Sequence, residues 1–219
     1  MPKVDYRLNA LVDARFGDKA HLADLARIAA LNGATLIQYR DETSSTREMI
    51  EQARAMCAAL AGTGVPFVVS DRVDVALAAG AAGVHLGRDD IDAATARSIM
   101  GDTAIIGLTV KNEADAETAI ASPIDYACIG GVYETLSKHN PDPPLGLEGL
   151  ARLRATLLAA EPNLPVGAIA SINAQRAADV VAAGADGVAV ISTIFAAVDP
   201  VAATRELRAC VENALGEAS

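Results

Sequence analysis

The sequence predicts an α/β protein that forms one closed (β/α)8 TIM barrel over residues 1–219. Short β-rich apolar runs alternate with alanine-rich stretches of helical character, and eight such units fit into 219 residues. Alternation of this kind also permits an open doubly wound sheet, but eight units in so short a chain favour the compact barrel. Since no linker or low-complexity segment interrupts the pattern, we expect a single domain.

Eight apolar runs are interpreted as the strands, because each is followed by a stretch that can be helical. In chain order they are Arg7 to Val12, Thr35 to Tyr39, Phe67 to Ser70, Gly83 to Leu86, Ala104 to Leu108, Tyr126 to Ile129, Val166 to Ile169 and Gly187 to Ile191. Several stretches between them carry apolar residues at three-to-four spacing, which suits helices on the outside of a barrel. Such stretches are Arg47 to Ala61, Asp92 to Met100, Leu147 to Ala160 and Ala174 to Ala183.

A weak internal repeat, AAGAAGV at residues 78–84 and AAGADGV at residues 182–188, predicts two equivalent corners between a helix and a strand. The first glycine of each corner fits a helix C-cap with positive φ. The second glycine allows the helix and the sheet to pack closely.

Composition excludes several classes of partner. A formal net charge of −10 without a basic stripe argues against nucleic acid. No secretory signal is visible, and no apolar run approaches the roughly 20 residues of a membrane span. Three widely spaced cysteines in apolar stretches are typical of buried thiols in a reducing compartment. We therefore expect a cytoplasmic protein that binds neither nucleic acid nor membrane.

Polar or glycine clusters follow most of the predicted strands and point to one site for an anionic substrate. If the strands are parallel, their carboxyl ends share a face, and distant residues become neighbours around one ligand. The clusters lie at residues 38–42, 70–72, 87–90, 107–109, 130–138, 168–171 and 190–192.

Two acids in these clusters, Asp71 and Asp90, are candidate ligands of Mg²⁺. Each immediately follows a predicted strand, and adjacent strands would bring both to one rim. Magnesium commonly uses one or two protein carboxylates together with substrate phosphate and water. The alternative is that both are solvated loop acids or helix N-caps, especially Asp90.

A glycine turn at residues 130–138 carries two hydroxyls, at Thr135 and Ser137, and the ammonium of Lys138. Such a loop can surround a phosphate with backbone N–H groups, hydroxyls and a point charge. An ordinary connection with an exposed lysine is the alternative. The proline-rich stretch that begins at Pro141 follows, and we place it in a long loop at the same face.

Other strand ends carry less specific candidates. Ser171 and the pair Ile191 and Ser192 end the last two predicted strands, where barrels often bind phosphate through backbone amides, although a lone serine is more often a cap. Arg40 could form a local surface salt bridge, and Gln38 could be a polar residue of the barrel interior.

One histidine, His85, lies within a predicted strand. It is interpreted as a hydrogen-bonded structural residue without a chemical role, in preference to a general base.

The ordered combination of these segments resembles the thiamine phosphate synthase family over nearly the whole chain. Members carry Gln-x-Arg-x-Lys, Asn-Asp-Arg-Val-Asp-x-Ala, Val-His-x-Gly-Gln-x-Asp, Gly-x-Ser and Thr-x-Thr/Ser-Lys motifs. The corresponding segments here are QYRDE at 38–42, SDRVDVA at 70–76, VHLGRDD at 84–90, GLT at 107–109 and TLSK at 135–138.

The resemblance implies a TIM barrel that joins 4-amino-5-hydroxymethyl-2-methylpyrimidine diphosphate to 4-methyl-5-(2-phosphoethyl)thiazole, with release of diphosphate and formation of thiamine phosphate. It further implies an Mg²⁺ cofactor, small phosphorylated substrates and a homodimer. By motif position, the resemblance implies that Asp71 and Asp90 bind Mg²⁺. It implies that the pyrimidine diphosphate is bound by Gln38, Arg40, Thr109 and Lys138, of which Arg40 and Lys138 are catalytic residues that act on the departing charge. The residues implied for the thiazole phosphate are Thr135, Ser137, Ser171, Ile191 and Ser192.

Departures from the family pattern fall within this substrate site. Glu42 replaces the family lysine and places an anion where a diphosphate is expected, which is unfavourable unless Mg²⁺ or Arg40 intervenes. Ser70 replaces an asparagine and shortens a polar contact. Ser171 replaces a glycine and could either donate a hydrogen bond or crowd the ligand. Arg88, in place of a glutamine, could restore positive charge.

Two other functions stay open. A diverged relative could act on another phosphorylated azole, as the related thiazole tautomerases do, but the histidine expected near Lys111 for that activity is absent. A non-catalytic protein that binds phosphorylated thiamine precursors is the alternative of a different class.

Overall fold

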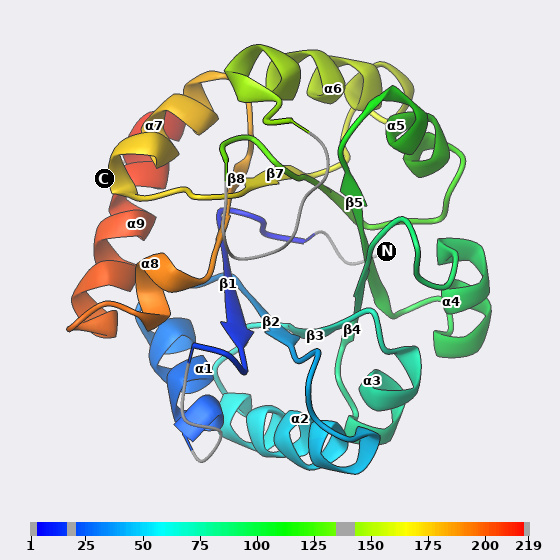
Figure 1. Ribbon diagram of the computed structural model, residues 1–219, viewed down its shortest axis with the longest axis vertical. Coiled ribbons are helices and arrows are strands. Elements are labelled where there is room, and N and C mark those ends of the chain that lie inside the picture. The colour runs from blue at the N-terminus through cyan, green and yellow to red at the C-terminus, as the bar shows by residue number, and fades with distance from the viewer. Residues whose placement is uncertain (1–3, 17–20, 135–142, 217–219) are drawn as a thin grey trace.

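The computed structural model describes residues 4–16, 21–134 and 143–216, and the strands within them form a closed parallel barrel. Each strand pairs with the next along the chain, and the last pairs with the first through Ala10 and Val190. Figure 1 shows the helices as an outer ring around these strands. The predicted (β/α)8 barrel is therefore confirmed, and the open sheet is excluded.

All eight predicted strands are present. They are β1 (Leu8–Asp13), β2 (Leu36–Arg40), β3 (Phe67–Ser70), β4 (Gly83–Leu86), β5 (Ile105–Val110), β6 (Tyr126–Ile129), β7 (Val166–Ile169) and β8 (Gly187–Val190). The largest difference is in β5, which continues two residues beyond its predicted end and pairs with β6 up to Val110.

The helices that cover the barrel include the four that the apolar spacing predicts. In the described residues they are α1 (Leu22–Leu31), α2 (Thr46–Leu60), α3 (Val73–Ala79), α4 (Ala93–Met100), α5 (Glu113–Ile120), α6 (Gly146–Ala160), α7 (Ala174–Ala182), α8 (Ser192–Phe195) and α9 (Pro200–Leu215). Side-chain caps fix several starts, because Ser45, Asp92, Asn112 and Asn173 each accept a hydrogen bond from the third backbone N–H of the helix that follows.

Two apolar cores result from the alternation of side chains along the strands. The larger core lies between the strands and the helices, and the smaller one fills the barrel interior with residues that include Tyr6, Leu36, Tyr126 and Cys128. Of the three cysteines, only Cys128 is fully buried, whereas Cys57 and Cys210 are half-buried. Burial raises the pKa of the Cys128 thiol to about 12.

The positive φ predicted for the first glycine of each corner is confirmed. Gly80 and Gly184 have φ values of 75° and 110° at the ends of their helices. A Cβ atom on Gly83 would lie 1.8 Å from the backbone oxygen of Ile105, and one on Gly187 would lie 2.1 Å from that of Tyr6. The second glycine of each corner is therefore required by close approach of its strand to the neighbouring backbone, and not by the packing of helix against sheet that the sequence suggests.

Tyr6 lies inside the barrel, below the strand ends that carry the polar clusters. Its ring centroid is 5.0 Å from that of Tyr126, and a Cβ atom on Gly167 would overlap its ring. The buried Tyr6 side chain fills the amino-terminal end of the barrel interior. It therefore closes the interior on the side opposite to the strand ends that carry the polar clusters.

Candidate functional site

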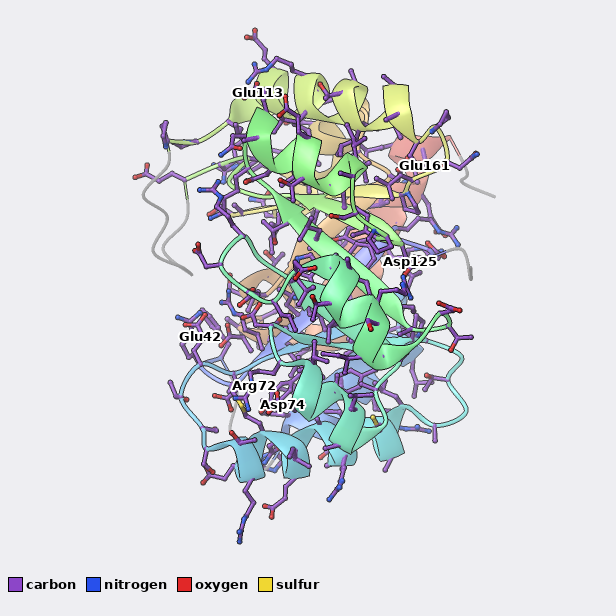
Figure 2. All side chains as sticks on the ribbon, turned by 90° about the vertical axis from the view of Figure 1, so that its right-hand side faces the viewer. Glu42, Arg72, Asp74, Glu113, Asp125 and Glu161 are labelled. Carbon is purple, nitrogen blue, oxygen red and sulfur yellow. The ribbon has the colours of Figure 1, made fainter. Side chains whose placement is uncertain are left out.

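A cavity of about 360 Å³ lies at the carboxyl-terminal end of the barrel, and every strand contributes to its walls. Figure 2 shows this end on one side of the molecule, where Glu42, Arg72 and Glu113 follow strand ends, whereas Asp125 and Glu161 precede strands on the opposite side. Parallel strands thus bring distant clusters to one rim, as the sequence predicts.

Most of the candidate residues line this cavity. Those that do are Gln38, Arg40, Ser70, Asp71, Asp90, Thr109, Ser171, Ile191 and Ser192. Thr135, Ser137 and Lys138 lie outside the described residues, as does Pro141. The described part of the candidate phosphate loop contributes Gly130 and Gly131 to the cavity wall.

Glu42 is exposed and is not among the residues that line the cavity. Its charge acts on Arg15: a hydrogen bond to Asp13 is the main cause that raises the pKa of Arg15, and the Glu42 carboxylate adds to this effect. The structure therefore places Glu42 beside a cation at the rim.

Arg40 is held in the cavity wall by Asp13, which lies opposite it in the parallel pair of β1 and β2. The Arg40 Nε donates a hydrogen bond to Asp13 Oδ2 at 2.7 Å, and Nη2 contacts the same oxygen. Both residues are buried, with 8% and 2% of their surfaces exposed. Arg40 is therefore fixed by a buried partner, in an ion pair that differs from the local surface salt bridge considered from the sequence.

Asp13 is anionic because its cationic neighbours outweigh its burial. Burial alone would raise the pKa of this carboxyl, but hydrogen bonds from Arg15 and the charge of Arg40 bring its pKa below the ordinary value. Sequence reasoning missed Asp13. The available signal was an acid directly after the predicted first strand, in the same position as the other candidates.

The two candidate metal ligands reach the cavity from adjacent strands. Asp71 directly follows β3 with a φ of 64°, and its backbone N–H donates to the carbonyl of His85 at 2.8 Å. Asp90 Oδ2 accepts a hydrogen bond from the Gly87 N–H at 2.6 Å. Neither acid is a helix cap, because the N-cap of α4 is Asp92 and that of α3 is Arg72.

Two carboxylates that line the same cavity suit Mg²⁺ that also takes oxygen ligands from a phosphorylated substrate. Among the described residues, no group of three or more acids, histidines or cysteines could hold a metal ion by itself. The donor set therefore fits an ion shared with a ligand better than a site built from protein alone. Asp71 has a positive φ although it is not glycine, and backbone strain of this kind is often found at functional positions.

Amide and hydroxyl groups from three neighbouring strands form a hydrogen-bonded row beneath the cavity. Asn9 Nδ2 donates to Gln38 Oε1 at 3.0 Å, and Gln38 Nε2 donates to Ser70 Oγ at 2.8 Å. Gln38 is thus the polar interior residue that the sequence allows, and it also lines the cavity.

His85 has the structural role that the sequence predicts, since its two ring nitrogens lie 3.0 Å from Tyr126 OH and 2.8 Å from Thr109 Oγ1. It also lines the cavity.

A second ion pair borders the cavity and was missed at the sequence level. Arg88 Nε and Nη2 donate to the two oxygens of Asp115 at 2.9 and 2.8 Å. Asp115 Oδ2 also accepts the backbone N–H of Lys111 at 2.9 Å. All three residues line the cavity. Arg88 thus brings positive charge to the wall together with a matching carboxylate.

The hydroxyl of Ser171 forms a hydrogen bond within the protein. Ser171 Oγ donates to the carbonyl of Glu134 at 2.6 Å, and Arg176 Nη1 donates to the carbonyl of Ser171 at 2.8 Å. The Arg176 guanidinium also lies 4.4 Å from the ring centroid of Tyr133. With φ values of 115° at Ala170 and 49° at Ser171, this turn adopts a conformation that favours glycine, the residue that the family pattern has at the second position.

None of the described helices is long and apolar enough to span a membrane.

Comparison with known proteins gives the same relationship by sequence and by structure. Residues 8–194 match a family model described as thiamine monophosphate synthase. A thiamine-phosphate synthase from Agrobacterium fabrum is 64% identical over 215 residues, which cover 98% of either chain. One from Chloroflexus aurantiacus is 42% identical over 95% of this chain and 94% of its own. A thiamine phosphate pyrophosphorylase structure from Pyrococcus furiosus superposes with a TM-score of 0.85 at 36% identity, and covers 98% of this chain and 99% of that one.

Proposed function

The chain belongs to the thiamine monophosphate synthase family, and on that basis we propose that it couples 4-amino-5-hydroxymethyl-2-methylpyrimidine diphosphate to 4-methyl-5-(2-phosphoethyl)thiazole. The protein is an enzyme of the transferase class. The proposed products are thiamine phosphate and diphosphate. The observation that carries the proposal is the buried Arg40 in the wall of a cavity that Asp71 and Asp90 also line.

In the proposed reaction, the bond between the pyrimidine methylene carbon and the diphosphate oxygen breaks first, and its electron pair leaves with the diphosphate. The resulting cation is stabilised by the aminopyrimidine ring. The lone pair of the thiazole nitrogen then forms the new carbon–nitrogen bond. No proton has to be transferred, so the reaction requires electrostatic stabilisation of the leaving group more than a general base.

Arg40 is suited to stabilise that leaving group. Its guanidinium is fixed in advance by Asp13, so that little reorganisation is needed when charge develops on the diphosphate. Lys138 is proposed as a second cation on the same group. Gln38 and Thr109 are proposed to orient the pyrimidine.

The pair Asp71 and Asp90 would hold the proposed Mg²⁺. When bound, this ion supplies positive charge to the phosphate oxygens of the leaving group. The support for this assignment is their position in neighbouring walls of the cavity and the preference of Mg²⁺ for a small number of protein carboxylates.

The thiazole phosphate is proposed to bind at the ends of β7 and β8, with Ser171, Ile191 and Ser192, and with the hydroxyls of Thr135 and Ser137. Because Ser171 Oγ donates a hydrogen bond to the backbone carbonyl of Glu134, the Ser171 hydroxyl would offer the phosphate no donor. We expect backbone N–H groups to make the contact there instead.

Family resemblance also supports a homodimer, which we propose together with a cytoplasmic location. Sedimentation equilibrium of the purified chain checks the first proposal: a mass of about twice 22.4 kDa is expected. A mass equal to that of one chain at micromolar concentration would contradict it.

The proposed reaction is tested with purified protein, Mg²⁺ and both precursors, followed by mass spectrometry. We expect thiamine phosphate and diphosphate in equal amounts, and we expect Lys138→Ala to abolish both. Arg152→Ala is the matched control, because this exposed cation pairs with Glu113 outside the cavity. Binding of the thiazole phosphate without turnover would favour the non-catalytic protein, and isomerisation of a thiazole alone would favour the tautomerase.

A further inference from the structure

We propose that Tyr126 and His85 are positioning residues that make the Thr109 hydroxyl a hydrogen-bond donor to the ligand in the cavity. The group recognised by Thr109 is then an acceptor, such as a bare ring nitrogen or a phosphate oxygen. This inference deepens the proposed function, and it rests on that function for the identity of the substrate.

The three side chains form a chain of hydrogen bonds that crosses neighbouring strands β4, β5 and β6. Tyr126 OH lies 3.0 Å from His85 Nδ1, and His85 Nε2 lies 2.8 Å from Thr109 Oγ1. His85 and Thr109 line the cavity, whereas Tyr126 has no exposed surface. The arrangement thus leads from the closed interior of the barrel to the cavity wall.

Gly107 makes this chain possible. It lies beside both His85 and Tyr126 in the sheet register. A Cβ atom on Gly107 would lie 2.0 Å from Tyr126 Cζ and 2.4 Å from its hydroxyl oxygen. The absence of a side chain at this position therefore provides the space through which the phenol reaches the imidazole.

The direction of the hydrogen bonds follows from the buried phenol. Tyr126 OH carries a proton that needs an acceptor, and within the described residues His85 Nδ1 is the acceptor that the structure provides. Burial, the largest cause, raises the pKa of Tyr126 well above its ordinary value, so the phenol keeps this proton. Tyr126 therefore donates, and Nδ1 of His85 carries no hydrogen.

The tautomer of His85 then determines what Thr109 offers. With Nδ1 bare, the ring proton is on Nε2, which donates to Thr109 Oγ1. The threonine oxygen thus acts as an acceptor toward His85, and its own proton is directed elsewhere. In the described part of the chain His85 is the recorded hydrogen-bond partner of Thr109, so the remaining donor is available to the cavity.

The opposite direction leaves a buried group unsatisfied. If Nδ1 carried a proton, as in the other tautomer or in the imidazolium, it would donate to the phenol oxygen. Among the described residues, the Tyr126 proton would then lack an acceptor in a fully buried position, which costs the desolvation of a hydroxyl.

A donor at Thr109 has a consequence for specificity. An aminopyrimidine presents ring nitrogens as acceptors and its exocyclic amine as a donor. Thr109 would therefore bind a ring nitrogen or a phosphate oxygen and would disfavour an orientation in which the amine faces it. The Tyr126 phenol acts on this choice without touching the ligand.

The tautomer is measured directly by long-range proton–nitrogen NMR on protein with isotopically labelled histidine. The chain has three histidines, so His21→Gln and His139→Gln variants assign the signals. We expect a bare Nδ1 and a protonated Nε2 for His85 in the unliganded protein. A protonated Nδ1 would overturn the proposal, and this result does not depend on whether the enzyme turns over its substrate.

The effect on the ligand is measured by calorimetric titration with the pyrimidine diphosphate. Thr109→Val and Tyr126→Phe are each expected to weaken binding about tenfold, the typical effect of one lost hydrogen bond, and the double variant little further. Thr109→Ser should retain affinity. Tyr39→Phe is the control, because it removes a buried tyrosine hydroxyl that donates to Asp41 outside the cavity. Wild-type affinity in folded Tyr126→Phe would contradict the proposal.

Discussion

Replacement of Arg40 by glutamine is expected to lower kcat for thiamine phosphate formation by about 100- to 1,000-fold. The guanidinium is a buried cation in the cavity wall, and its interaction with the substrate would strengthen as charge develops on the departing diphosphate. Loss of such an interaction reduces kcat more than it raises KM. Steady-state kinetics with both precursors, each at saturating concentration, measures this effect.

Two variants separate the role of Arg40 from a general effect of charge or folding. Arg152→Gln removes an exposed cation that forms an ion pair with Glu113, and its rate should equal that of the wild type. Asp13→Asn keeps the guanidinium but weakens its anchor, so an intermediate loss of kcat is expected. A folded Arg40→Gln protein that retains more than about a tenth of the wild-type kcat would contradict the assignment.

Replacement of Gly83 by alanine is expected to lower the free energy of unfolding by about 3 kcal/mol or more. The new methyl group would lie 1.8 Å from the backbone oxygen of Ile105, and neither strand can move without disturbing the closed barrel. The clash cannot be relieved by rotation of a side chain, since the contacting atom belongs to the backbone. Urea denaturation followed by far-ultraviolet circular dichroism measures the change.

Gly64→Ala is the matched control for that substitution. Gly64 has a φ of 75°, and a Cβ atom there would have open space, so the alanine carries conformational strain alone. We expect a cost of about 1 kcal/mol for Gly64→Ala. Equal losses for the two variants would show that close approach of the β4 and β5 backbones is not what requires glycine at position 83.

The positions of the strands could be predicted from the sequence because local patterns determine them. A run such as Phe67–Ser70 is buried along its whole length, and the positive φ of Gly80 is the conformation that the end of a helix favours. The end of β5 is harder to predict from the sequence, because Thr109 and Val110 extend the strand through pairing with β6. Tertiary contacts, which the sequence pattern does not contain, determine that boundary.

The side-chain partners within the site were harder to predict than its location. Asp13 becomes the partner of Arg40 through the parallel register of β1 and β2, and Arg88 meets Asp115 from the start of α5. Neither pairing follows from spacing along the chain. From the sequence, Ser171 could either donate a hydrogen bond to a ligand or crowd it. The hydrogen bond that it donates to the Glu134 carbonyl depends on a segment 37 residues away.

The most direct test of the central claim, that the charged wall of this cavity binds the departing diphosphate, is calorimetric titration of inorganic diphosphate in the presence of Mg²⁺. Wild-type protein and Arg152→Gln are expected to bind it with the same affinity. Arg40→Gln and Asp71→Asn should each bind it at least about tenfold more weakly. The first variant loses a cation that faces the diphosphate, and the second loses a ligand of the proposed Mg²⁺. Binding by folded Arg40→Gln that is as tight as that of the wild type would contradict the claim.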